Sequence, residues 1–90
     1  MDNNDGNTIK SNFMLGVTNM KIEKYNDAIV PLEKVVNHND NLFLEQAKWF
    51  LSVCYLNVDN TSDARDLFQN IADSESIYKN KAKRALKKLK

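Results

Sequence analysis

Apolar residues recur at spacings of three and four along most of the chain, which is the pattern of one face of an α-helix. The pattern predicts helices over residues 8–21, 26–37, 42–58, 62–72 and 77–89. The short stretches between them are rich in Asn, Asp, Ser and Thr, which favour turns and helix caps. Residues 1–7 (MDNNDGN) carry no such pattern, and we expect them to form a disordered tail.

Two of the predicted helices differ in how much of their surface is apolar. The helix over residues 42–58 is apolar around more than half its circumference, so it should be covered on more than one side. The helix over residues 77–89 has one narrow apolar stripe against many lysines, as a helix at the end of a stack would have. Pro31 falls inside the second helix, where it should remove one backbone hydrogen bond and bend the helix slightly.

The chain repeats itself at an interval of 36 residues, which aligns residues 13–36 with 49–72 without a gap. Four residues recur identically, because Leu15, Val17, Asp27 and Ala28 align with Leu51, Val53, Asp63 and Ala64. Several other aligned pairs exchange one apolar residue for another, such as Phe13 for Trp49 and Leu32 for Phe68. Each copy therefore predicts one pair of helices.

This repeat resembles the tetratricopeptide repeat. The matching positions are Leu15-Gly16 and Leu51-Ser52 in the first helices, Tyr55 and Tyr25 at the aromatic positions, Ala28 and Ala64 at the helix crossing, and Leu32 and Phe68 after it. The pattern is missing at Asn19, Thr61, Val35, Ile71, Asp40 and Ser76. The resemblance implies an all-α, right-handed α-α superhelix of five antiparallel helices. Residues 8–90 would form one domain, with repeat one at 9–41, repeat two at 42–76 and a capping helix at 77–89.

Four small residues agree with this architecture on physical grounds. Two helices that cross closely need little side-chain bulk at the contact, and Gly16, Ala28, Ser52 and Ala64 supply it. A larger residue at such a contact should cost about 1–3 kcal/mol through overpacking. We therefore expect all four to face a neighbouring helix.

Composition and charge narrow the class of protein. With 42% hydrophobic and 28% charged residues the chain is of the globular type, and it has no apolar run long enough to span a membrane. The net charge of +1 conceals an asymmetry, because all 12 acidic residues lie at or before Glu75 while the last helix is rich in lysine. Such lysines complement the helix dipole. A basic surface for an anionic membrane or a nucleic acid remains an alternative, although the tail lacks the aromatics that single strands stack on.

The sequence offers no set of residues for catalysis. His38 is the single imidazole, and no Cys or carboxylate stands at metal-ligand spacing from it. Cys54 cannot form an internal disulfide, and its apolar helix predicts a buried, inert thiol. No glycine-rich loop is present to hold a phosphate. We therefore expect no enzymatic activity, no metal and no cofactor.

A binding surface is the remaining candidate. The resemblance implies that first-helix residues line a concave groove, and these are Lys10, Phe13, Val17, Met20, Gln46, Trp49, Val53 and Leu56. Aromatic residues and Met are favoured at interfaces, so an extended peptide or an amphipathic helix of a partner protein is the expected ligand, with Trp49 and Phe13 as the main contacts. Apolar residues replace the Lys and Asn with which some family members bind a carboxylate, so such a clamp is not expected.

Two questions stay open at this stage. The same apolar stripe could be covered by the N-terminal tail or by a second copy of the chain, which would make it a homo-oligomerisation surface. The compartment could be cytoplasmic or periplasmic. The chain is also similar to small repeat modules of bacterial membrane-anchored proteins, which end in an aromatic-rich helix and a lysine-rich cap, so it could be one part of a longer, anchored protein.

Overall fold

The computed structural model describes residues 5–38 and 41–89, and within these ranges it contains five α-helices and no strand. The helices are α1 (Asp5–Lys21), α2 (Tyr25–Val36), α3 (Leu44–Asn57), α4 (Thr61–Ala72) and α5 (Lys79–Lys88). The prediction of an all-helical chain is confirmed. Helix α1 begins at Asp5, three residues before the expected start, so residues 5–7 of the expected tail are helical, and residues 1–4 lie outside the described part.

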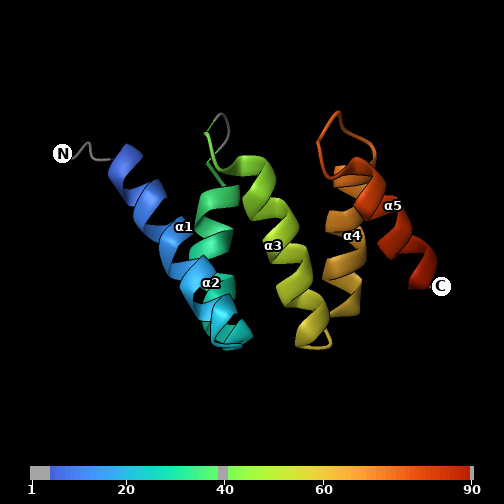
Figure 1. The fold of residues 1–90 in the computed structure, drawn as a ribbon, viewed down its shortest axis with the longest axis horizontal. Helices are drawn as coiled ribbons and strands as arrows, with labels where there is room; N and C mark the ends of the chain where they lie inside the picture. The colour runs from blue at the N-terminus through green and yellow to red at the C-terminus, as the bar shows by residue number, and fades with distance from the viewer. Residues whose placement is uncertain (1–4, 39–40, 90) are drawn as a thin grey trace.

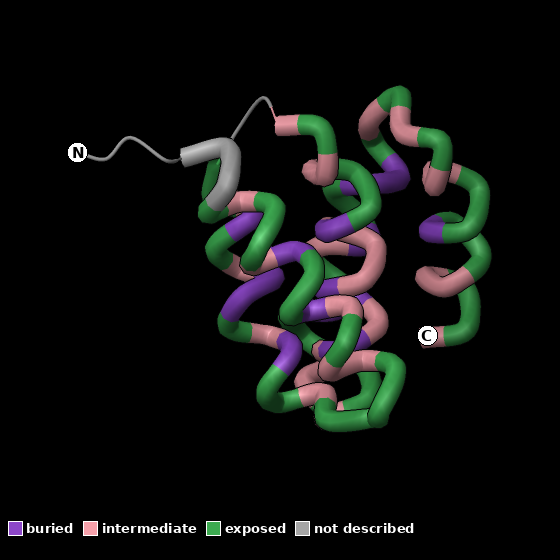
Figure 2. Tube along the Cα trace, turned by 60° about the vertical axis from the view of Figure 1, so that its left-hand side comes forward, coloured by how far each residue is buried: buried purple, intermediate pink, exposed green. Residues whose placement is uncertain are grey.

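The helices stand in a row in chain order and point alternately down and up, with the two termini at opposite ends (Figure 1). Each helix packs on the next one, and α1 also touches α3. The molecule is elongated, with principal extents of 45 × 28 × 18 Å. Buried residues lie between the helices, and the outer sides of α1 and α5 are exposed over most of their length (Figure 2).

The turn inside each helix pair has the same backbone geometry in both copies. Glu23 and Asp59, 36 positions apart, both adopt left-handed backbone, with φ of 62° and 63°. In the first turn Lys24 N–H donates to the Asn19 carbonyl at 2.8 Å, and in the second Asn60 N–H donates to the Tyr55 carbonyl, also at 2.8 Å. These bonds form a Schellman motif, which satisfies the last carbonyls of a helix. The sequence repeat is therefore also a repeat of structure.

The small residues lie where helices touch, as expected. Gly16 is buried, and Ala28, Ser52 and Ala64 are fully buried. A Cβ atom on Gly16 would stand 2.5 Å from Cγ of Leu32, so α1 and α2 approach each other more closely there than any larger residue permits. In the second copy the Ser52 hydroxyl occupies the equivalent position and donates to the Lys48 carbonyl at 2.8 Å.

The buried side chains form two clusters along the row. The first joins α1, α2 and α3 around Leu32, Val35 and Leu51. The second joins α4 and α5 around Phe68 and Ile71, with Trp49 and Tyr55 of α3 packed against it. Helix α3 contributes to both clusters, which explains why its sequence is apolar on several sides.

Pro31 lies within α2 and is buried, and the helix continues through it from Tyr25 to Val36. Proline has no N–H, so the carbonyl of Asp27, four residues earlier, loses its helical donor. The Asn19 side-chain amide of α1 donates to this carbonyl instead, at 3.2 Å. Asn19 is one of the departures from the repeat signature, and Leu67, which replaces Pro31 in the second copy, keeps its N–H. The two unusual residues of copy one therefore compensate each other.

Candidate interaction surface

The eight predicted contact residues come from α1 and α3, which touch each other although α2 packs between them in the chain order. Lys10, Gln46 and Leu56 are exposed, and Val17, Met20, Trp49 and Val53 are partly exposed. Phe13 alone among them is buried, with 8% of its surface exposed. Seven of the eight can therefore touch a partner, and they form a stripe that runs across two helices.

The interpretation of Phe13 as an exposed contact has to be corrected. Its ring stacks on Phe43, which precedes α3, with centroids 4.6 Å apart, and lies 6.0 Å from the ring of Phe50. Stacked aromatic rings of this kind stabilise the fold beyond the area they bury. Phe13 is thus a core residue that holds α1 against the start of α3.

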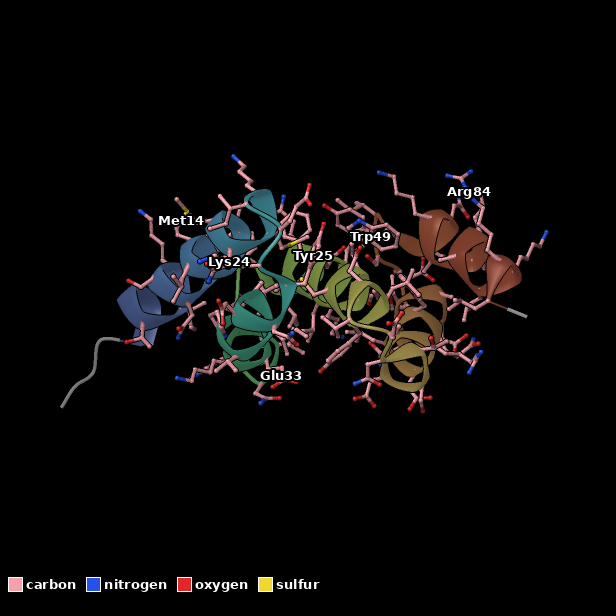
Figure 3. The ribbon with its side chains drawn as sticks, turned by 90° about the horizontal axis from the view of Figure 1, so that it is seen from below. Met14, Lys24, Tyr25, Glu33, Trp49 and Arg84 are labelled. Atoms are coloured by element: carbon pink, nitrogen blue, oxygen red, sulfur yellow. The ribbon has the colours of Figure 1, made fainter. Side chains whose placement is uncertain are left out.

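Trp49, the equivalent of Phe13, is also engaged within the chain. Its ring stacks on Tyr78, which precedes α5, at 5.6 Å and an interplanar angle of 6°, and it packs at a tilt on Phe68 at 5.5 Å. Lys81 Nζ lies 5.8 Å from the Tyr78 ring centroid, within reach of a cation–π interaction. In Figure 3 Trp49 lies between α3 and α5. Only part of the indole remains free for a partner.

The residues that cover these two rings were not singled out from the sequence, although a signal for them exists. Phe43 N–H is held by the side chain of Asn41 at 2.9 Å, and Tyr78 N–H is held by the Ser76 hydroxyl at 3.0 Å. Both turns place an aromatic residue two positions after the side chain that accepts its N–H, directly before the first residue of α3 or α5. The interval between them is 35 residues instead of 36, so the 36-residue alignment did not pair them.

A groove of about 670 Å³ lies on another side of the molecule, between α2 and α4, with α3 as its floor. Its lining includes the carboxylates Glu33, Asp63 and Asp66 and the hydroxyl-bearing Tyr55. The Tyr55 hydroxyl donates to Glu33 at 2.5 Å and so ties α3 to α2. Burial, assisted by this hydrogen bond and the nearby carboxylates, raises the pKa of Tyr55. Figure 3 shows Glu33 on the side opposite Trp49.

The residues that could take part in catalysis or metal binding lie at separate places in the fold. Cys54 is fully buried, and burial raises the pKa of its thiol from 9.0 to about 11, so the thiol stays protonated at neutral pH and is a poor nucleophile. His38 is exposed at the end of α2. In residues 5–38 and 41–89, no three His, Cys, Asp or Glu side chains come together in a way that could hold a metal ion. None of the described helices is long and apolar enough to cross a membrane.

Comparisons of the chain with protein-family models, with curated proteins and with solved structures found no match. The function of the chain has to be inferred from its own residues and their arrangement.

Proposed function

We propose that the chain is a non-catalytic interaction or assembly module, built as a right-handed superhelix like that of tetratricopeptide repeats. The observation that carries this proposal is the recurrence of one helix pair with the same Schellman turn at Glu23 and Asp59. Small residues at the helix crossings support the proposal further. Helix α5 also supports it, because it follows the second pair in the place where the first helix of a third pair would stand. Elongated stacks of helix pairs offer continuous surfaces, which is how such proteins commonly bind others.

The binding surface that fits this architecture is the stripe of α1 and α3 that remains accessible. Val17 and Met20 of α1 stand at positions equivalent to Val53 and Leu56 of α3, so four apolar side chains form a row across two neighbouring helices. Lys10 and Gln46 lie at the start of the same row and are exposed. A peptide or helix with two apolar anchors matches this layout, and a polar rim completes it.

Selection of peptides from a random library by the purified chain tests the proposal. The selected peptides should lose about tenfold or more in affinity for a Val53→Glu variant, because a charge would be placed in an apolar contact. A Gln69→Glu variant is the control, since Gln69 is an exposed residue of α4 that lies outside the stripe. Peptides that bind all three proteins equally would refute this surface.

The alternative that the stripe joins two copies of the chain is separated by sedimentation. The Val53→Glu variant is the suitable probe, because Trp49 is packed on Tyr78 and Phe68 and its truncation would also weaken the fold. A dimer that Val53→Glu converts to a monomer would favour self-association over peptide binding.

A further inference from the structure

The outer side of α1 bears an exposed apolar row that the stripe does not include. Met14, Leu15 and Ile22 are 55%, 52% and 57% exposed, and Thr18 completes the row at helical spacing. In Figure 3 Met14 projects away from the rest of the molecule. Large aliphatic side chains that gather on one helix face indicate an interaction surface more often than scattered ones do.

The repeat shows what this row would contact. Its equivalents are Phe50, Leu51 and Cys54 of α3, and Val58 directly after α3. Leu51 is only 3% exposed and Cys54 is fully buried, in the cluster that joins α3 to α1 and α2. Leu51 lines a groove together with Val36 of α2, and Val58 lines another with Tyr25 of α2. On α3, therefore, α2 borders the face at Leu51 and Val58 and Phe13 of α1 packs on Phe50, whereas the equivalent face of α1 is open.

A residue of α2 extends the open surface. Val30 is 56% exposed and corresponds to Asp66, which borders Leu51 across the groove of the second copy. By the same correspondence Val30 stands beside Leu15. Both positions are exposed, and the residue is apolar in the first copy and charged in the second.

The charges around the row indicate the kind of helix that fits. Along α1, from residue 8 to residue 21, the charged residues are Lys10 and Lys21, which are exposed and adjacent to Met14 around the helix, and the exposed Glu23 follows Ile22 in the turn. A second copy is disfavoured as the occupant. The helix at the other end of the molecule, α5, presents the basic residues Lys83, Arg84 and Lys87. The faces of α2 and α4 that could cover the α1 of another copy are already occupied by α3 and α5. Two copies of α1 face to face would bring like charges together.

We propose that the face formed by Met14, Leu15, Thr18, Ile22 and Val30 is a docking site for an amphipathic helix of a partner protein. The apolar residues of that helix have the spacing found in α2 at Tyr25, Ile29, Leu32 and Val36. Acidic residues stand beside them. The partner helix takes the place on α1 that α2 takes on α3. This site lies beside the stripe assigned above and shares none of its apolar residues, while Lys10 borders both surfaces.

A peptide derived from α2 tests the site directly. The probe is a synthetic peptide of residues 22–38 with Lys24→Glu and Lys34→Glu, which keeps the apolar row of α2 and makes it acidic; the unaltered peptide is the comparison for charge. Binding is followed by amide chemical shifts of the full chain in solution. We expect saturable shifts at Met14, Leu15, Thr18, Ile22 and Val30, with weaker binding of the unaltered peptide and at higher salt.

Variants of the chain decide the outcome. Leu15→Glu should weaken binding of the acidic peptide by about tenfold or more, because it removes apolar burial and adds a like charge. Ile77→Glu should leave binding unchanged, since Ile77 is 81% exposed in the turn before α5, at the other end of the molecule from α1. Val53→Glu, which tests the stripe, should also leave it unchanged. Because each variant alters a different surface, failure of one proposal is distinguishable from failure of the other.

Three results would overturn the docking site. The first is shifts that map to the groove between α2 and α4 instead of to α1. The second is equal binding of the acidic peptide to the wild type and to Leu15→Glu. The third is a dimer, seen by sedimentation without peptide, that Leu15→Glu converts to a monomer, because a second copy would then be the occupant.

Discussion

The two helix pairs carry equivalent residues in different surroundings. Leu15 of α1 and Leu51 of α3 occupy the same position of the repeat, yet they are 52% and 3% exposed. Helix α3 has α2 and α4 on either side, whereas α1 packs on α2 and has no described helix on its outer side (Figure 1). Burial at this position is therefore decided by the place of the helix in the row. The comparison also shows which face of the molecule is ready for a further helix.

The largest expected contrast between the copies is the cost of truncating these two leucines. Leu51→Ala should lower the free energy of unfolding by about 2–4 kcal/mol, because it leaves a cavity in the first core cluster. Leu15→Ala should change it by less than about 0.5 kcal/mol, as for an ordinary surface substitution. Urea denaturation monitored by circular dichroism measures both. Equal costs would mean that α1 is covered in solution.

The second contrast concerns the helix crossings. Gly16→Val should destabilise the chain by about 1–3 kcal/mol, because its side chain would overlap Leu32. Ser52→Ala is the mild counterpart, since it removes one hydrogen bond to the Lys48 carbonyl and adds no bulk, and it should cost about 1 kcal/mol or less. Thermal unfolding of both variants compares them. A harmless Gly16→Val would contradict the close approach of α1 and α2.

A third prediction tests the compensation between Asn19 and Pro31. Asn19→Ala should cost about 0.5 kcal/mol, because the Asp27 carbonyl then exchanges the side-chain amide for water. In a Pro31→Leu background, where the backbone N–H of residue 31 is restored, the same change should cost close to nothing. A double-mutant cycle of unfolding free energies gives the coupling. Additive effects would show that the two residues act independently.

The smallest expected effect is a loss of folding stability at alkaline pH, which arises from two residues of the second copy. Burial raises the pKa of Cys54 from 9.0 to about 11, and burial together with the hydrogen bond to Glu33 raises that of Tyr55. The folded state therefore holds both protons more tightly than the unfolded state. Their stabilising contribution is complete below about pH 9 and is lost as the pH rises through the raised pKa values. The first copy has Thr18 and Asn19 at these positions, which add nothing comparable.

Unfolding free energies measured between neutral and alkaline pH check this sign. Tyr55→Phe should reduce the alkaline loss, because one of the two groups no longer titrates. A loss of the same size in Tyr55→Phe and in the wild type would assign the sensitivity to other groups.

Much of the helical layout was predictable from local patterns. Apolar spacing located every helix to within a few residues, and the small residues Gly16, Ala28, Ser52 and Ala64 marked the contacts between helices. Local patterns could not distinguish an aromatic residue that binds a partner from one that binds the next loop. Phe13 and Trp49 both had the sequence character of exposed anchors, and both proved to be stacked on aromatic residues about 30 positions later.

The candidate surfaces were harder to predict than the helices for the same reason. Lys10, Gln46 and Leu56 are exposed as expected, while the open row of Met14, Leu15 and Ile22 was not recognised, because its equivalents on α3 are buried and an alignment of the copies treats them alike. The exposure of a residue in a repeat depends on whether a neighbouring helix is present. That information lies outside the helix itself.

By itself the sequence determined the helices and the repeat, since each depends on the spacing of residues along the chain. Only the tertiary structure decided which apolar faces are satisfied inside the chain and which remain open. The physical reason is that helical periodicity states which residues share a face, whereas burial of that face requires a second surface, and the second surface comes from residues distant in the chain. This is why Leu15 is exposed and Leu51 is buried although the two residues occupy the same position of the repeat.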